Sequence, residues 1–235
     1  MKPCMRILSL LMTFAGMCLP TIVMAIPPAE SPVALVSKVV LDVTRKEVFK
    51  DWQIARRGET LSSGDRVKTG ENSVAVIKFK DNSLVRVREQ SELTITGTTT
   101  GSSFSKSVNM ENGVVGFNIK KQKVDEEFRF TSPTSVASIR GTGGKFSSLG
   151  QSDTLTVIEG AVLLTNSISS EFVEVRAGYT GISNSDGTIS VRPATTDELT
   201  TAGNAARVSD QENRLELELR DNEGNRKELK IEIKE

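Results

Sequence analysis

Few residues of this 235-residue chain have the type and spacing that catalysis or cofactor binding requires. The glycine-rich segment 141–144 lacks the helix and the acidic residue that follow in a dinucleotide site. Ser103 and Lys106 have the spacing of a serine–lysine nucleophile pair, but that pair needs a helix and these residues lie in a Thr/Ser-rich segment. The acids at 125–127 point in different directions along an extended chain, which favours a solvated turn over a cation site. We therefore predict no catalytic, cofactor-binding or metal-binding residues.

The first 25 residues are typical of a secretory signal peptide. Lys2 and Arg6 precede a mostly apolar segment that ends at Ala25, a residue small enough for signal peptidase. A retained membrane anchor is the alternative, but Pro20 and several polar residues interrupt the apolar run that a spanning helix needs. We predict cleavage between Ala25 and Ile26, a periplasmic location with an extracellular one as the alternative, and no membrane span after cleavage.

Cleavage at this position leaves a chain with neither cysteine nor histidine, because Cys4 and Cys18 precede it and the sequence has no histidine. Removal of Lys2 and Arg6 leaves 28 basic against 30 acidic residues, a formal net charge of −2. Nucleophile pairs that use histidine are then excluded, as are zinc and copper sites built from imidazole or thiolate. Aromatic residues are too few to form a stacking surface, so we expect no nucleic-acid partner.

Short strands separated by turn residues dominate the rest of the chain. Val74–Phe79 is a β-branched and aromatic run, and Leu84–Arg88 alternates apolar with basic residues. Turns are predicted at four clusters that contain glycine or asparagine: Gly64-Asp65, Gly70-Glu71-Asn72, Asp81-Asn82-Ser83 and Glu111-Asn112-Gly113. The pattern predicts an all-β fold: a coiled, solenoid-like or sandwich-like stack of short strands with a C-terminal hairpin and at most one short helix.

Composition divides the chain into five segments. The signal peptide (1–25) is followed by a proline-rich linker (26–32), the β-domain (33–193), a linker or short helix (194–213) and a β-hairpin (214–235). The hairpin is predicted because leucine and isoleucine alternate with charged residues on both sides of a polar turn at 221–225. An isolated hairpin is marginal in water, so its apolar face must lie on the domain's own sheet or on a partner.

Basic residues gather on the strands around the turn at 81–83. If this turn is a three-residue loop, Phe79 opposes Val85 and Lys78 opposes Arg86, with Lys80 and Arg88 on the same polar face. The alternative is that the two strands do not pair. Exposed charge is the default on such strands. If the domain has a working surface, however, Lys78, Lys80, Arg86 and Arg88 are its candidate residues, with the acidic C-terminal segment as an internal competitor.

Arg140 stands at the end of an apolar run, which is a costly place for a cation. Alternation along this strand places Val136, Ser138 and Arg140 on one face and Ala137 and Ile139 on the other. We expect Arg140 to be at least half buried and bonded to a carboxylate, with Asp65 as the first choice, or to loop carbonyls. A structural role is favoured over ligand binding.

Three segments, in this order, resemble the FecR domain: GETLSSGDRVKTGENSVAVIKFKDNSLVRV at 58–87, FRFTSPTSVASIRGT at 128–142, and TLTVIEGAVLLTN with VRAGYTGI at 154–166 and 175–182. The motif residues in them are interpreted as structural; they are Gly64, Asp65, Thr69, Gly70, Arg140, Gly141 and Thr142. Asn82 stands where family members commonly have glycine, and asparagine tolerates the same turn conformation.

The resemblance implies a strand-rich periplasmic module without enzymatic activity. Signalling members couple an outer-membrane transducer to a cytoplasmic sigma factor, but this chain opens with a predicted signal peptide, so the link to iron signalling is not carried over. We expect a non-catalytic, exported protein-interaction or scaffold module of the bacterial cell envelope, with another envelope protein as its partner and no cofactor. The alternative is an envelope ligand-binding protein for polysaccharide, peptidoglycan or an oxygen-ligated cation.

The signal-peptide assignment predicts that the exported protein begins at Ile26. Intact-mass measurement and N-terminal sequencing of protein from the periplasmic fraction should both locate this end, because signal peptidase needs the small side chain of Ala25. The variant Ala25→Asp should accumulate uncleaved in the membrane fraction. A wild-type protein that keeps residues 1–25 would contradict the assignment.

Overall fold

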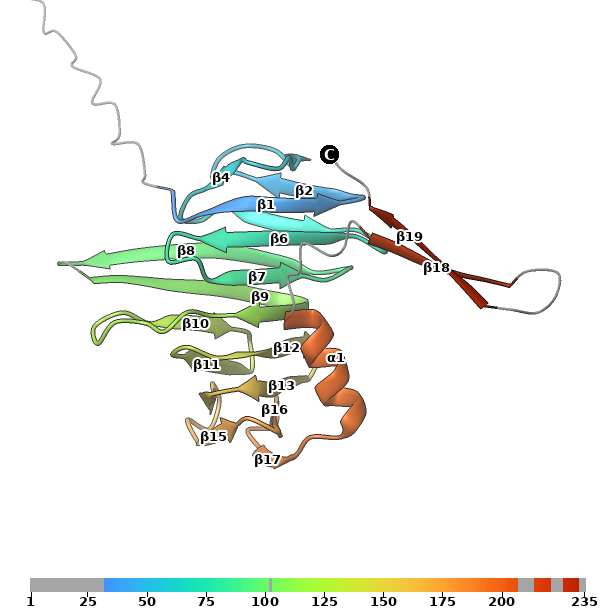
Figure 1. Cartoon of the computed structure of the whole chain (residues 1–235). Helices are drawn as coiled ribbons and strands as arrows, with labels where there is room; N and C mark the ends of the chain where they lie inside the picture. Colours follow the sequence, from blue (N-terminus) through green and yellow to red (C-terminus); the bar gives the residue numbers. More distant parts are fainter. Residues whose placement is uncertain (1–31, 102, 207–213, 221–225, 233–235) are drawn as a thin grey trace, which may run out of the picture.

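The computed structural model describes residues 32–101, 103–206, 214–220 and 226–232. Within these ranges the chain forms 19 strands and one helix, which confirms the predicted all-β fold (Figure 1). The predicted signal peptide, its cleavage site at Ala25 and Ile26, and the linker up to residue 31 lie outside the described residues.

Seventeen of the strands form two hydrogen-bonded layers that share strand β9. Sheet A is antiparallel throughout, and its strands in spatial order are β4 (Thr60–Leu61), β1 (Ala34–Val40), β6 (Val74–Phe79), β7 (Leu84–Val87), β9 (Ser103–Asn118), β12 (Gly143–Leu149), β13 (Ser152–Glu159), β16 (Tyr179–Asn184) and β17 (Ile189–Pro193).

Sheet B has the same number of strands and one parallel pair, between β9 and β10. Its strands in spatial order are β3 (Gln53–Ile54), β2 (Val43–Lys46), β5 (Arg66–Thr69), β8 (Glu92–Thr100), β9, β10 (Phe128–Thr131), β11 (Ser135–Ile139), β14 (Ala161–Asn166) and β15 (Phe172–Arg176). The sequence left open whether the strands form a solenoid-like or a sandwich-like stack. With this pairing they form a long two-layer sandwich.

Strand β9 joins the layers because it changes sheets in its middle. Its first half pairs with β8 and β10 in sheet B, and its second half pairs with β7 and β12 in sheet A. The register shifts at Glu111, and Gly113 takes φ = +136°. A Cβ on Gly113 would lie 2.4 Å from the side chain of Ser91. The turn predicted at 111–113 is therefore wrong: the glycine supplies a bulge that bends one continuous strand.

The core lies between the layers and is centred on phenylalanines from both sheets. Phe128 and Phe130 of sheet B meet Phe79, Phe117 and Phe146 of sheet A, with ring centroids 4.9–5.8 Å apart. All five are buried. Edge-to-face and tilted aromatic pairs at these distances stabilise a core beyond the area they bury.

The other predicted turns have the backbone that their residue types indicate. Gly64, Asn72 and Asn82 all take positive φ, at +91°, +54° and +63°. Asn82 therefore adopts the positive φ that asparagine tolerates better than most residues.

The predicted C-terminal hairpin is present. β18 (Arg214–Arg220) and β19 (Arg226–Glu232) pair antiparallel, with Leu217 opposite Leu229 and Leu215 opposite Ile231. Its turn at 221–225 and the last three residues lie outside the described residues.

A buried carboxylate ties β13 to the turn before β11. Asp153 is fully buried, and its Oδ2 accepts hydrogen bonds from the hydroxyls of Ser132, Thr134 and Ser135, the last at 2.5 Å. No partner for Oδ1 lies among the described residues. A buried carboxylate that accepts from three hydroxyls holds its neighbours in one arrangement, because the buried hydroxyls of Thr134 and Ser135 would otherwise lose this acceptor.

We predict that Asp153→Ala lowers the free energy of unfolding by about 3 kcal/mol, since it leaves the buried hydroxyls of Thr134 and Ser135 without their acceptor. Urea unfolding followed by circular dichroism measures this. The matched control Asp51→Ala removes an exposed carboxylate and should cost less than about 0.5 kcal/mol. Equal midpoints for the two variants would contradict the role given to Asp153.

Candidate protein-interaction surface

The predicted basic residues lie on β6, β7 and the turn between them, but the two strands pair in a different register from the one predicted. Ile77 opposes Val85, Lys78 opposes Leu84 and Val76 opposes Arg86. The loop is Lys80–Asn82, closed by the Phe79 N–H donating to Ser83 O at 2.9 Å. A shift of two residues keeps apolar side chains on the core face and removes the predicted Lys78–Arg86 pair, so like charges do not oppose each other.

Arg86 is not part of a free surface, because helix α1 (Thr196–Ala206) covers it. The helix packs against β7, β9, β12 and β13 on the outer face of sheet A (Figure 1). Arg86 is 8% exposed, and its Nη1 donates to Asn204 O at 3.4 Å. Beside it, Gly116 lets the helix approach closely, since a Cβ there would lie 2.0 Å from Ala205 O. Arg86 therefore stabilises the C-terminal end of the helix, where a cation is favourable.

The N-terminal end of α1 is held by a capping box. Thr195 and Glu198 exchange backbone-to-side-chain hydrogen bonds of 2.8 and 3.2 Å, and Arg192 binds the Glu198 carboxylate with two nitrogens. The ion pair with Arg192, followed by the Thr195 N–H, lowers the pKa of Glu198 to about 2. Charged residues at both ends thus fix the helix that covers sheet A.

Lys78 and Lys80 lie beside a shallow groove of about 320 Å³ that also includes Leu35 and Phe79. Lys80 is exposed and its ammonium lies 5.9 Å from the centre of the Phe104 ring. Arg88 is half-buried at the end of β7. The four predicted residues therefore do not form one open basic face: α1 covers Arg86, and Lys80 lies in the turn beyond the strands.

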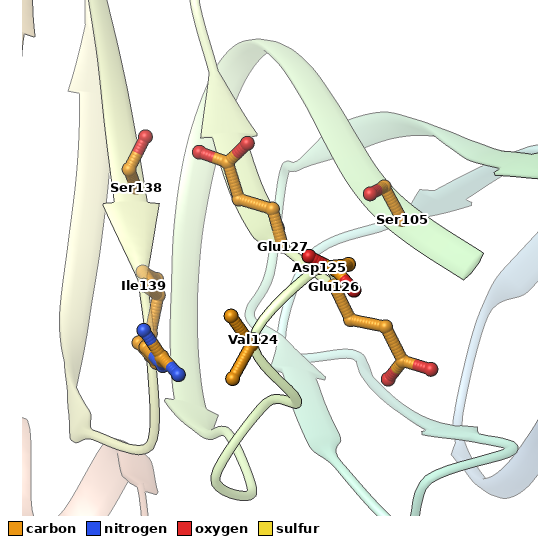
Figure 2. A pocket seen from close by; sticks show the side chains of 8 residues that line it. Ser105, Val124, Asp125, Glu126, Glu127, Ser138 and Ile139 are labelled. Atoms are coloured by element: carbon orange, nitrogen blue, oxygen red, sulfur yellow. The ribbon is translucent and has the colours of Figure 1, made fainter. Parts of the chain in front are cut away.

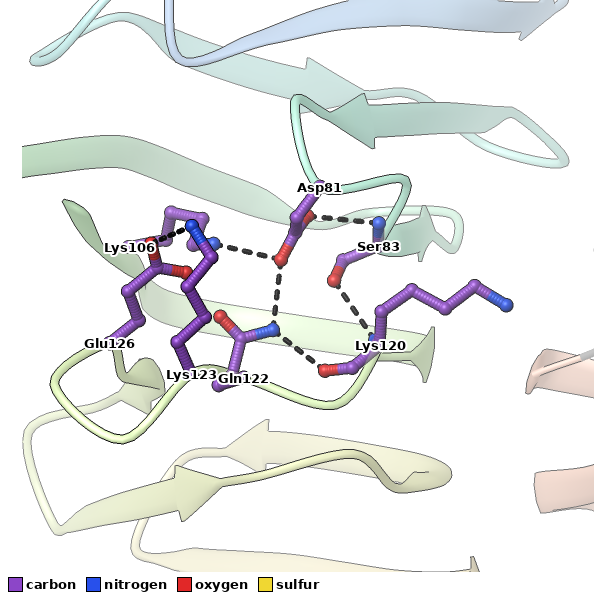
Figure 3. A network of polar contacts seen from close by, with 7 residues as sticks. All are labelled: Asp81, Ser83, Lys106, Lys120, Gln122, Lys123 and Glu126. Atoms are coloured by element: carbon purple, nitrogen blue, oxygen red, sulfur yellow. Dashed lines mark hydrogen bonds and ion pairs between the residues drawn. The ribbon is translucent and has the colours of Figure 1, made fainter. Parts of the chain in front are cut away.

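A polar network closes the sandwich beside this groove (Figure 3). Asp81, from sheet A's turn, accepts from the buried Lys106 of sheet B and from Gln122, each at 2.8 Å. Burial alone raises the pKa of Asp81, but these two hydrogen bonds outweigh it and hold the pKa below its usual value. Lys106 therefore pairs with a structural carboxylate that links the two layers. Ser103, which has the spacing of a nucleophile partner for Lys106, is not part of this network.

The first group of motif residues supports turns. Asp65 is buried and accepts the Ser62 N–H at 2.8 Å, and burial raises its pKa. Thr69 is buried and its hydroxyl donates to Arg88 O at 2.5 Å. The Gly70 N–H donates to Asp42 O at 2.9 Å. Gly64 takes positive φ in its turn. All four motif residues of this group therefore support the fold.

The expectation that Arg140 is half buried against Asp65 is wrong. Alternation is as predicted, with Ala137 and Ile139 in the core, but Arg140 follows the end of β11 and is exposed. Asp65 precedes β5, which lies four strand spacings from β11, about 19 Å. Gly141 lies against the Lys121 backbone, and Thr142 is buried, its carbonyl accepting the Ile119 N–H.

An open cleft of about 360 Å³ lies beside the acidic loop at 124–127, with Ser138 and Ile139 across from the loop (Figure 2), and Arg140 is among the residues that line it. The carboxylates of Glu126 and Glu127 point away from each other and bind Lys123 and Arg129 respectively. The hydrogen bond from Arg129 lowers the pKa of Glu127. Asp125 lies in an exposed turn, as predicted, whereas Glu126 and Glu127 are half-buried in these ion pairs.

The outer face of sheet B differs from that of sheet A, because no helix of the described residues packs on it. Cross-strand neighbours form a polar row across it: Lys46, Arg66, Thr94, Asn109 and Thr131. Asn109 and Thr131 bond to each other. The row is largely uncharged at its centre and basic at its β2–β5 end.

That basic end carries an exposed aromatic and aliphatic cluster, which we call the Trp52 patch: Trp52, Ile54, Arg66 and Lys68. The Arg66 guanidinium lies 5.7 Å from the centre of the Trp52 ring and is ion-paired with Glu92. Trp52 is 38% exposed and Ile54 73%. Trp52 and Lys68 also line a cleft of about 260 Å³. Tryptophan and arginine in such partly exposed stacks are the residue types that dominate binding energy at protein interfaces.

The prediction from sequence missed this patch. Its signal was the single tryptophan of the chain two residues before an isoleucine, a spacing that places both on the same face of a strand. Only the pairing of β2, β3 and β5 brings Arg66 and Lys68 beside them.

The described residues hold no group of three or more acidic, cysteine or histidine side chains arranged for a metal ion. Helix α1, at 11 residues, is neither long nor apolar enough to cross a membrane.

The Glu198 pKa yields a pH prediction. The folded state lowers this pKa from 4.5 to about 2, so the carboxylate's stabilising contribution is complete above pH 4.5 and is lost as the pH falls toward 2. Glu198→Gln should therefore cost about 0.5–1 kcal/mol at pH 7, and this cost should fall steadily below pH 4.5 and disappear once the pH is below 2. Thermal unfolding across this range measures the difference. A pH-independent difference, or an equal one for the exposed control Glu111→Gln, would contradict it.

Comparison with known proteins identifies part of the chain. Residues 65–163 match the family model described as FecR protein. Two crystal structures of a "putative anti-sigma factor" from Parabacteroides distasonis ATCC 8503 superpose with a TM-score of 0.49, at 13% and 14% identity, over 57% of this chain. The matched part is 62% of that protein, so the chain spans less than two thirds of it. The search of curated proteins found no match.

Proposed function

From the premise that residues 65–163 are a FecR domain, we propose that this protein is a non-catalytic, exported protein-interaction or scaffold module of the bacterial cell envelope. Its partner is another envelope protein, and its working surface is the open outer face of sheet B, with the Trp52 patch as the anchor.

The Trp52 patch is the observation that supports this proposal. Arg66 is already fixed by its ion pair with Glu92 and its stack on Trp52, so a partner gains these contacts without ordering a free side chain. Ile54 adds exposed apolar area, and Lys68 adds a positive rim. An apolar anchor beside cations fits a partner surface with an apolar pocket and acidic neighbours.

The asymmetry of the sandwich supports the same surface. Residues of α1 cover the outer face of sheet A at β7, β9, β12 and β13 and bury Arg86, which leaves that part of the sheet without an exposed basic row. The outer face of sheet B keeps its side chains accessible at Ile54, Lys68 and Asn109.

Site-specific crosslinking in cells tests the proposal. A photo-reactive p-benzoylphenylalanine at position 54 should crosslink to an envelope protein, and the same group at Thr201, exposed on α1, should not. Adding Trp52→Ala should reduce the crosslink at position 54 by about tenfold, because loss of an interface anchor costs about 1–2 kcal/mol. Circular dichroism checks that the variant remains folded. Equal labelling from positions 54 and 201, or no effect of Trp52→Ala, would contradict the proposal.

A further inference from the structure

The two ends of the sandwich differ in how their edge strands are protected. At one end the outermost strands, β3 and β4, have two residues each. At the other end β15 and β17 have five each. Very short edge strands prevent pairing with another chain, whereas a longer edge offers a row of unpaired backbone groups. The β15–β17 end is therefore the one that can accept another strand.

Strand β15 pairs with β14 alone among the described strands, and the hydrogen bonds at its ends show which groups remain free. Asn166 N–H donates to Glu171 O at 2.8 Å, and Ala177 N–H donates to Gly160 O at 2.9 Å. Backbone groups alternate sides along an antiparallel strand, so residues 171, 173, 175 and 177 direct their N–H and C=O groups toward β14. Phe172, Glu174 and Arg176 thus direct their N–H and C=O groups to the open edge.

The side chains of these same three residues are exposed. Phe172 is 67% exposed, and Glu174 and Arg176 form an ion pair within the strand, with an N–O distance of 2.8 Å. Val175 is buried on the opposite face. The edge thus carries one large apolar side chain and one charge of each sign on its outer face.

We propose that β15 is a homodimer edge: it pairs antiparallel with β15 of a second copy, about a two-fold axis at Val175. In this register Glu174 of each copy opposes Arg176 of the other, which makes two equivalent ion pairs from residues with free backbone groups. The neighbouring antiparallel register centred on Glu174 opposes Glu174 to itself, and a parallel in-register pairing does the same. The charge pattern therefore selects one register, in which sheet B continues from one copy into the other.

Sedimentation velocity over a range of concentrations tests this with protein expressed from the full sequence. The wild type should show a reversible monomer–dimer equilibrium. Glu174→Arg and Arg176→Glu should each weaken dimerisation by about tenfold, because each places like charges opposite each other twice. The double variant Glu174→Arg/Arg176→Glu restores both the pairs between copies and the pair within the strand, so it should return the dimer constant to within about threefold of the wild type.

Two further variants keep the test specific. Glu174→Pro removes an N–H that faces the open edge and leaves the bonds to β14 intact, so it should abolish the dimer while thermal unfolding changes little. Glu126→Arg, a charge reversal in the acidic loop, should leave the dimer unchanged. A wild type that stays monomeric up to about 100 μM, a dimer insensitive to Glu174→Pro, or a double variant as weak as the single ones would overturn the proposal.

Discussion

The passage of β9 from one sheet to the other is the constraint on which the rest of this structure depends. Its 16 residues supply a central strand to both layers, so the sheets cannot slide or separate without breaking pairs with β7, β8, β10 and β12. Gly113 makes the passage because only glycine fits its positive φ beside Ser91. The phenylalanine cluster and the Asp81–Lys106 pair then fill the space between the layers that β9 has joined.

The two outer faces have different roles as a result of one short helix. Ala205 of α1 packs at Gly116, and charges at the ends of the helix, Arg192 with Glu198 and Arg86 with Asn204 O, fix it on sheet A. Strand alternation predicts that Arg86 lies on the surface, but the helix buries it and makes it part of the scaffold. Sheet B, without such a cover among the described residues, keeps Trp52, Ile54, Lys68 and Asn109 exposed, which is why the proposed working surface lies there.

Local chemistry predicted much of the fold and little of the candidate surface. Turns at Gly64, Asn72 and Asn82 follow from residues that tolerate positive φ, and the core positions of Ala137 and Ile139 follow from alternation. The predicted β6–β7 register was wrong by two residues. A shift by an even number of residues keeps the same side chains on the apolar face, so the hydrophobic pattern does not distinguish the predicted register from the observed one. The turn expected at Gly113 was wrong because a bulge and a turn use the same residue type.

The sequence by itself determined that this is an all-β chain of short strands, with turns at defined residues and a C-terminal hairpin, because these properties depend on neighbours along the chain. Tertiary structure alone decided which residues meet across strands: that Arg86 lies under α1, that Arg140 is exposed far from Asp65, and that Trp52 stacks on Arg66. It also shows how two motif residues stabilise turns, with Asp65 accepting the Ser62 N–H and Thr69 donating to the Arg88 carbonyl. Pairing between distant strands is set by the topology of β9 and by register, and neither is encoded in local periodicity.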